Sequence, residues 1–183
     1  VSHQLIALVG LSSWLLLALV MPATAAETIW HIKAIHPEGR TVDVKALDKT
    51  GTIHPVKALE VDGNLHLMDV KAIIGEARAP VKILVGDERY LPVKAIGEDG
   101  AIFDIKALLP DGTRLDVKGV RRAGNIIDIK AIAPDGSFWA VKAISPAGHL
   151  HDVKGLKMFE RRVEAVISSV EVHAHIKALP QVY

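Results

Sequence analysis

The chain has 183 residues, with 22 Lys and Arg against 21 Asp and Glu, and it contains no cysteine. A nearly neutral balance argues against a nucleic-acid partner, which requires a basic face, and the missing thiols exclude disulfides, thiolate zinc sites and a cysteine nucleophile. Half of the residues are hydrophobic, so the chain can bury the core of one domain.

The first predicted element is the apolar segment 1–26, which contains no Asp, Glu, Lys or Arg. It ends in Pro22 and small residues up to Ala26, a pattern typical of a secretory signal peptide. A membrane anchor is the alternative, since an apolar run of about 16 residues approaches the length that spans a bilayer. We favour a signal peptide at 1–26, followed by a single β-repeat domain at 27–183. That domain is expected in the periplasm or outside the cell, without membrane insertion.

From residue 27 onward the sequence repeats a unit of about twelve residues that reads Asp-Val-Lys-Ala in its most regular form. The residue before each repeat lysine is Val or Ile, and the residue after it is Ala or Gly, except at Ile83. This period is too short for a helix with its connection and suits one strand with one turn. The repeat lysines are Lys33, Lys45, Lys57, Lys71, Lys82, Lys94, Lys106, Lys118, Lys130, Lys142, Lys154 and Lys177.

A glycine stands six residues after most of these lysines, as in Pro134-Asp135-Gly136. Proline presets φ at the second position of a turn, and glycine takes the left-handed conformation that follows. A type I turn closed by a left-handed residue is a common three-residue hairpin loop. The segments between these turns are rich in Val and Ile and are therefore predicted to be strands.

The turns also predict how neighbouring strands pair. A loop at 134–136 places Asp128 opposite Lys142, so that opposite charges meet. A loop at 122–124 places Lys130 opposite an aspartate in the same way. The strands would then form a ladder of lysine–aspartate neighbours.

The predicted fold class is all-β: an antiparallel meander of about 12–13 short strands, rolled into a barrel-like or two-layer sheet because long open sheets seldom stay flat. The alternative is a parallel β-solenoid with one unit per coil. A solenoid would stack lysine on lysine about 4.8 Å apart along the whole molecule, which like-charge repulsion opposes.

Alternation gives each predicted strand two faces. The Val or Ile before the lysine, the Ala or Gly after it and a variable large residue such as Trp30 or Trp139 are expected in the core. Asp, Lys and the final Ile or Leu are expected to face outward. Pro55, Pro80 and Pro92 replace Asp in three units, and because proline removes a hydrogen-bond donor, they predict an edge, a bulge or a corner.

The stretch 156–170 departs from the repeat. Its apolar residues lie partly at helical spacing, but it also reads as a strand, a turn at Ser168-Ser169 and a final strand containing Lys177. We favour the hairpin because the final strand is clearly a repeat unit.

The segment 30–39, Trp-His-Ile-Lys-Ala-Ile-His-Pro-Glu-Gly, is followed by serial Asp-Val-Lys-Ala units. Together they resemble an uncharacterised family of exported bacterial repeat proteins, and the resemblance covers essentially all of 27–183. It implies a bacterial envelope protein and supplies no activity, substrate or functional residue.

The charged residues recur in every unit, whereas a catalytic pair needs distinct environments that separate two pKa values. The sequence contains no nucleophile elbow, phosphate-binding glycine loop or metalloprotease helix motif. We therefore predict no enzyme, no catalytic residue and no cofactor.

Histidines near the two ends are the remaining candidates for a site. His173 and His175 share one strand face, and His31 would join them if the first and last strands met. Such a set could bind zinc or copper, although exposed strand histidines without a ligand are the simpler interpretation, and no metal ligand is assigned. Three further histidines are expected to be half-buried packing residues: His54, His149 and His151.

These observations favour a non-enzymatic structural or interaction protein of the envelope or the extracellular space. Its expected partner is a protein or an envelope component, and self-association is compatible with the sequence. The alternative is a periplasmic binding module for a metal or small ligand at the His-bearing terminal strands. In either case we expect function where the repeat fails: at the prolines, at the ends and in the irregular stretch.

Overall fold

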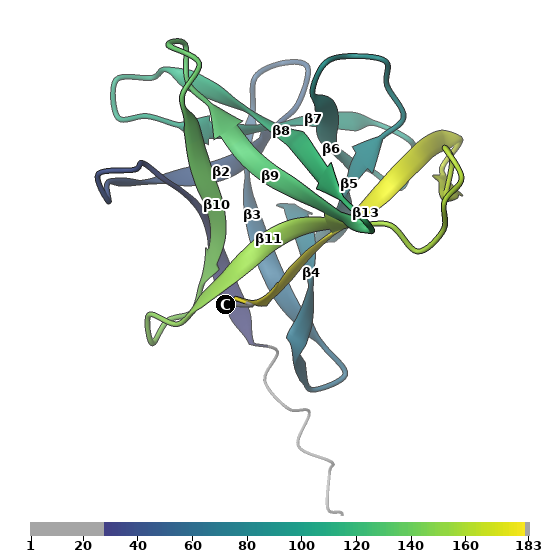
Figure 1. The fold of residues 1–183 in the computed structure, drawn as a ribbon, viewed down its shortest axis with the longest axis horizontal. Coiled ribbons are helices and arrows are strands. Elements are labelled where there is room, and N and C mark those ends of the chain that lie inside the picture. The colour runs from purple at the N-terminus through teal and green to yellow at the C-terminus, as the bar shows by residue number, and fades with distance from the viewer. Residues whose placement is uncertain (1–27, 182–183) are drawn as a thin grey trace, which may run out of the picture.

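The computed structural model describes residues 28–181, so the predicted signal peptide at 1–26 lies outside the described residues. The described chain forms 13 strands in one sheet (Figure 1). Every strand pairing is antiparallel, which confirms the predicted fold class and is incompatible with the parallel solenoid. The strands are β1 (Ile29–Ile35), β2 (Thr41–Leu47), β3 (Ile53–Val61), β4 (Asn64–Ile74), β5 (Ala77–Leu84), β6 (Leu91–Ile96), β7 (Ile102–Leu108), β8 (Arg114–Ala123), β9 (Ile126–Ile132), β10 (Phe138–Ile144), β11 (Leu150–Leu156), β12 (Ala165–Ile167) and β13 (Val170–Pro180).

The loop at 134–136 has the predicted construction. The Gly136 amide donates to the Ala133 carbonyl at 2.9 Å, and the Ala133 amide donates to the Ser137 carbonyl at 3.0 Å. Gly136 has a φ of +84°, which is the left-handed region. The Asp135 carboxylate accepts a further bond from the Ser137 amide at 2.9 Å. A type I turn closed by glycine therefore joins β9 to β10.

Each long strand changes its neighbour partway along its length. Pro55 is the last residue of β3 that pairs with β2, and Val56 is the first that pairs with β4. Pro80 and Pro92 lie at the corresponding points of β5 and β6. A residue without an N–H is tolerated at such a junction, so of the three predicted alternatives, an edge, a bulge or a corner, these prolines lie at corners.

Twelve of the strands form four groups of three, and within a group every strand pairs with the other two. The groups are β1–β2–β3, β4–β5–β13, β6–β7–β8 and β9–β10–β11. Each group is joined to each of the other three by one further pair of strands: β1–β10, β2–β7, β3–β4, β5–β6, β8–β9 and β11–β13. This is the connectivity of a tetrahedron, with the groups as corners and the joining pairs as edges. The single sheet closes on itself in this way, and β12 adds to β13 outside it.

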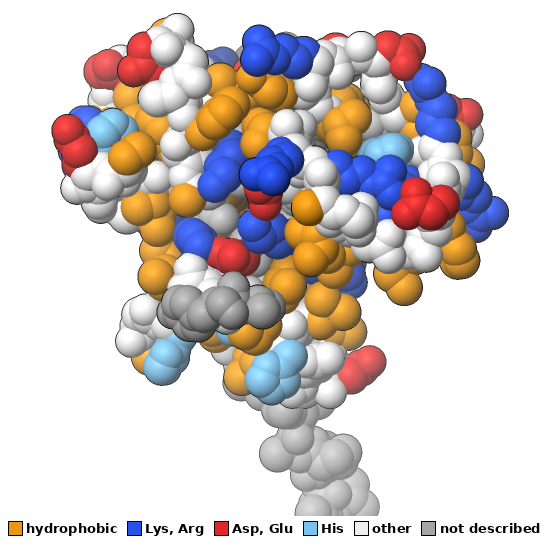
Figure 2. Space-filling model, viewed as in Figure 1, with side chains coloured by type: hydrophobic (Ala, Val, Ile, Leu, Met, Phe, Trp, Pro, Cys, Tyr) orange, Lys and Arg blue, Asp and Glu red, His pale blue; other side chains and the backbone are white. Residues whose placement is uncertain are grey.

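The joining pairs place repeat lysines opposite one another, in contrast to the predicted lysine–aspartate ladder. The opposed pairs are Lys33–Lys142, Lys45–Lys106, Lys57–Lys71, Lys82–Lys94, Lys118–Lys130 and Lys154–Lys177. The lysines meet aspartates inside the three-strand groups instead. Figure 2 shows basic and acidic side chains beside each other over β9, β10 and β11.

The predicted partners of Lys142 and Asp128 are therefore corrected. Lys142 forms its ion pair with Asp152 on the next strand, and Asp128 accepts from Lys154 at 2.6 Å. The reason is that β10 leaves β9 after Ala140, before it would reach Asp128.

The predicted register of β8 and β9 is also wrong. Their turn has two residues, 124–125, in place of the expected loop at 122–124. Glycine suits the first position of a two-residue turn as well as the last position of a three-residue loop, so its spacing alone did not distinguish them. With a bulge in β8, the shorter turn places Lys130 opposite Lys118 and not opposite Asp116.

The core lies at the centre of the four groups. The Val or Ile before each repeat lysine points inward, and these twelve side chains leave a central space of only about 10 Å³, too small for a ligand. Trp30 and Trp139 are buried around them, as predicted. Three residues that were expected to face outward are buried as well, outside the central cluster, because alternation does not predict which outer positions are covered: Leu47, Leu59 and Ile96.

The predicted C-terminal hairpin is confirmed. Ile167 pairs with Val170 across Ser168 and Ser169, whose φ values of 47° and 68° define a tight turn with two left-handed residues. Residues 157–164 before it form no regular element. Within residues 28–181, no helical segment has the length and apolarity needed to cross a bilayer.

Candidate functional site

The candidate site lies where two repeat units lack the usual aspartate. Pro92 lies opposite Lys118, and Ala140 lies opposite Lys130, where other units have aspartate. Lys118 instead donates to Glu88 at 2.8 Å. Because these lysines also face each other across β8 and β9, two adjacent cations lack their usual aspartates.

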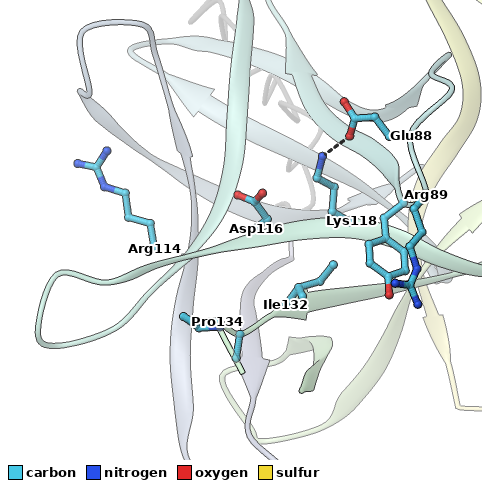
Figure 3. A pocket seen from close by; sticks show the side chains of 9 residues that line it. Glu88, Arg89, Arg114, Asp116, Lys118, Ile132 and Pro134 are labelled. Atoms are coloured by element: carbon cyan, nitrogen blue, oxygen red, sulfur yellow. Dashed lines mark hydrogen bonds and ion pairs between the residues drawn. The ribbon is translucent and has the colours of Figure 1, made fainter. Parts of the chain in front are cut away.

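The irregular loop 85–90 between β5 and β6 lies beside this pair of strands and bounds two hollows. The first has a volume of about 490 Å³, and Figure 3 shows Glu88 and Lys118 bonded to each other in it. Its lining residues are Glu88, Arg89, Tyr90, Arg114, Asp116, Lys118, Ile132, Ala133 and Pro134.

The second hollow has a volume of about 520 Å³ and shares Arg89 and Tyr90 with the first. We call the two together the Tyr90 groove. Both volumes are within the range of ligand pockets, about 300–1,000 Å³. The second hollow is lined by Arg89, Tyr90, Val120, Arg121, Asp128, Lys130 and Phe138.

The carboxylates of the Tyr90 groove are already bound by lysines. A hydrogen bond from Lys118, together with its charge, holds the pKa of Glu88 below its usual value, so Glu88 is ionised at neutral pH. The other two carboxylates are bound by lysines outside the groove, in the pairs Asp116–Lys106 and Asp128–Lys154.

Several cationic side chains of the groove have no carboxylate partner within residues 28–181. The side chains of Arg114, Arg121 and Lys130 form neither a hydrogen bond nor an ion pair with any residue of 28–181. Lys130 lacks a partner because Ala140 occupies the aspartate position opposite it. The groove therefore presents an excess of positive charge that an anionic group could neutralise.

Aromatic rings lie beside these cations. Tyr90 and Phe138 meet edge to face, with ring centroids 5.9 Å apart at an interplanar angle of 87°. The Arg89 guanidinium lies 5.0 Å from the centroid of the Tyr90 ring. Phe138 is 41% exposed, so an apolar surface remains available to a ligand.

Sequence reasoning did not find the Tyr90 groove, although a signal was present. Pro92 and Ala140 interrupt the aspartate pattern, but nothing in their spacing shows that both interruptions occur beside one pair of strands. The neighbourhood of Tyr90 and Phe138 depends on the β5–β6 loop, which has no repeat pattern.

The histidines considered for a metal site are separated. His31 contacts Lys57 in the β1–β2–β3 group, whereas His175 contacts Lys82 in the β4–β5–β13 group. β1 and β13 do not pair with each other among the described strands. His173 Nδ1 lies 2.8 Å from the Arg162 carbonyl, and no cluster of three or more His, Asp or Glu side chains in residues 28–181 could hold a metal ion.

The other histidines mostly pack as predicted. His54 is half-buried with its ring 5.6 Å from that of Phe103, and His151 lies 4.3 Å from Trp30. His149 is exposed, contrary to the prediction, because it precedes β11 in the turn and not in the strand.

The comparisons with known proteins give a family without a function. The chain belongs to a family of unknown function, DUF7486, whose model matches residues 26–179. No curated protein and no solved structure matches the chain.

Proposed function

We propose that this protein is a non-enzymatic binding protein of the bacterial envelope or the extracellular space, and that the Tyr90 groove holds an anionic ligand with a ring or other flat apolar face. Export is supported by the apolar segment 1–26 with its small-residue end. The resemblance to exported bacterial repeat proteins supports the same location. The ligand would be part of a protein or of an envelope component.

The observation that carries this proposal is the combination of cationic side chains without a carboxylate partner in residues 28–181 with an aromatic pair, in which Phe138 is exposed and Tyr90 is half-buried. Arg121 and Lys130 line the same hollow as Tyr90 and Phe138. A carboxylate, sulfonate or phosphate would supply the missing partner for the cations, while its ring would pack against the aromatic pair. Neither contact requires a reaction, which supports a binding function.

The test uses naphthalene-2-sulfonate as a probe, titrated into the protein by calorimetry. We expect saturable binding, much weaker binding of neutral 2-naphthol, and weak binding of inorganic sulfate, because each lacks one of the two contacts. Changing Arg121→Gln and Lys130→Gln together should weaken binding by roughly tenfold or more, since hydrogen bonds to charged groups contribute about 1.5–3 kcal/mol each.

Phe138→Ala should also weaken binding of the sulfonate. Lys49→Gln should leave binding unchanged, because Lys49 is an exposed lysine outside the groove. Equal affinity of the unchanged protein and the Arg121/Lys130 double variant, or no binding of the sulfonate, would refute the proposal.

A further inference from the structure

The irregular stretch 157–164 buries two charged residues. Lys157 Nζ donates to the carbonyls of Arg161 and His173 at 2.8 and 3.0 Å. Glu164 lies 3.9 Å from Lys157 Nζ and accepts from the Phe159 amide at 2.7 Å, both through Oε1. Its other oxygen, Oε2, is buried without a hydrogen bond. A buried oxygen without a partner is costly, so this orientation of Glu164 calls for an explanation.

That oxygen faces a histidine ring. Glu164 Oε2 lies 3.5 Å from His175 Nε2, and His175 Nδ1 lies 2.9 Å from Lys82 Nζ. Lys82 and His175 are also register partners on β5 and β13. A lysine ammonium can only donate, so Nδ1 accepts from it, and in the neutral ring Nε2 then carries the proton and faces Glu164.

The surroundings of Lys82 disfavour its charge. Burial lowers the pKa of Lys82 to about 8, with Lys177 and Lys71 acting in the same direction and Asp69 opposing them. Asp69, the carboxylate that opposes this shift, is shared with two other lysines, because Lys177 bonds to it and Lys71 lies 3.7 Å from it.

Charged neighbours of Lys82 come from each strand beside it. They are Asp69 and Lys71 on β4, Lys94 opposite it on β6, and His175 and Lys177 on β13. Burial, and next the charge of Lys82, also lower the pKa of His175, which keeps its ring neutral and able to accept a proton.

We propose that Lys82 is a nucleophilic amine that captures small aldehydes carrying an anionic group, with His175 as the proton acceptor and Glu164 as the residue that positions the imidazole. His175 Nδ1 takes the proton of the ammonium. The nitrogen lone pair then attacks the carbonyl carbon, and the two remaining N–H hydrogens leave with the carbonyl oxygen as water, forming an imine. Lys71 and Lys177 would hold the anionic group. The site is distinct from the Tyr90 groove, and the inference does not depend on the proposed function.

The chain contains its own control. Lys57 Nζ lies 2.7 Å from His31 Nδ1 at equivalent repeat positions. His31 is exposed, however, and its ring makes no ion pair with a carboxylate among residues 28–181. Lys57 therefore contacts a histidine that is not paired with a buried carboxylate. The difference in reaction rate between Lys82 and Lys57 then measures the combined effect of Glu164 and of the deeper burial of Lys82.

The experiment traps the imine with the full chain. The protein is incubated with glyoxylate and cyanoborohydride between pH 6.5 and 10, and modified lysines are quantified by peptide mass spectrometry. We expect Lys82 to react at least tenfold faster than Lys57 at pH 7.5, with a rate that rises up to about pH 8 and then levels. Acetaldehyde, which has no anionic group, should show a smaller preference for Lys82.

Two variants test the contacts that connect Lys82 through His175 to Glu164. His175→Gln and Glu164→Gln should each reduce labelling of Lys82 several-fold or more and leave Lys57 unchanged, whereas His31→Gln should leave Lys82 unchanged. Glu164→Gln leaves Lys157 buried without its carboxylate and is expected to destabilise this stretch, so the partly exposed His175 provides the decisive variant. Labelling of Lys82 at the rate of Lys57, or unchanged labelling in His175→Gln, would overturn the inference.

Discussion

In the core, a large side chain in one repeat unit fills space that small residues in other units leave. Ile83 follows its lysine where nearly all other units have alanine, and two units, at Gly119 and Gly155, have glycine there. A Cβ added at Gly155 would collide with Ile83 Cδ1 and lie 3.1 Å from Ile127 Cβ. A Cβ added at Gly119 would lie 3.4 Å from the same Ile83 atom. One larger side chain therefore occupies space that two smaller ones leave.

We predict that Gly155→Ala lowers the free energy of unfolding by about 1–3 kcal/mol, because it overpacks the core. Ile83→Val removes the colliding methyl group and should cost about 0.5–1.5 kcal/mol alone. The double variant should lose at least 0.5 kcal/mol less than the sum of the two, since the sites are in contact. Urea unfolding measures all three values. Strictly additive losses would show that Ile83 does not fill the space at Gly155.

At the scale of strands, the recurring contact is a lysine with the aspartate ten residues later. Lys142 and Asp152 are an example, on the paired strands β10 and β11. Burial raises the pKa of Asp152, but the hydrogen bond and charge of Lys142 outweigh it, and the pKa lies below its usual value. The contact therefore favours the folded state only while Asp152 is ionised.

This linkage predicts a pH dependence. Because the pKa of Asp152 is lower in the folded chain, its contribution is complete above the unfolded value, about 3.9, and is lost as the pH falls through the folded value. Asp152→Asn should lower the free energy of unfolding by about 1 kcal/mol at pH 7, within the range of hydrogen bonds to charged groups in partly exposed pairs.

The difference between Asp152→Asn and the unchanged protein should narrow below pH 4, as measured by urea unfolding across pH. Asp87→Asn is the matched control, because Asp87 binds Arg162 in an exposed pair and should change stability little. A difference of constant size down to pH 2 would exclude the ion pair as its cause.

At the scale of the whole molecule, the four groups differ from a linear repeat array. In a solenoid each unit contacts only its neighbours, so the ends can unfold separately. Here every group is joined to all three others. No group is terminal, and losing one would expose the centre that all twelve Val and Ile residues share.

We therefore predict one cooperative unfolding transition. Tryptophan fluorescence, to which Trp30 and Trp139 contribute from different groups, should give the same urea midpoint as far-UV circular dichroism. Ile32→Val and Val117→Ala alter the centre from two groups and should each shift both signals together. Separate midpoints for the two signals would show that the groups unfold independently.

The repeat pattern was sufficient to predict most of the local structure of the chain. The repeat predicts one strand and one turn per unit, the glycines mark where most of the turns lie, and alternation places Val, Ile and Trp30 in the core. These features depend on contacts between residues close in the sequence or within one hairpin, so a periodic sequence pattern can predict them.

The repeat pattern does not predict which strands meet after each one leaves its hairpin partner, because that pairing arises in the folded chain as a whole. This pairing places repeat lysines opposite one another and keeps His31 apart from His175. It also places Glu164 beside His175, and Tyr90 beside Phe138. The physical reason is that near-identical units offer near-identical partners. The pairing is therefore selected by how twelve inward side chains fill one centre, which is a property of the whole chain.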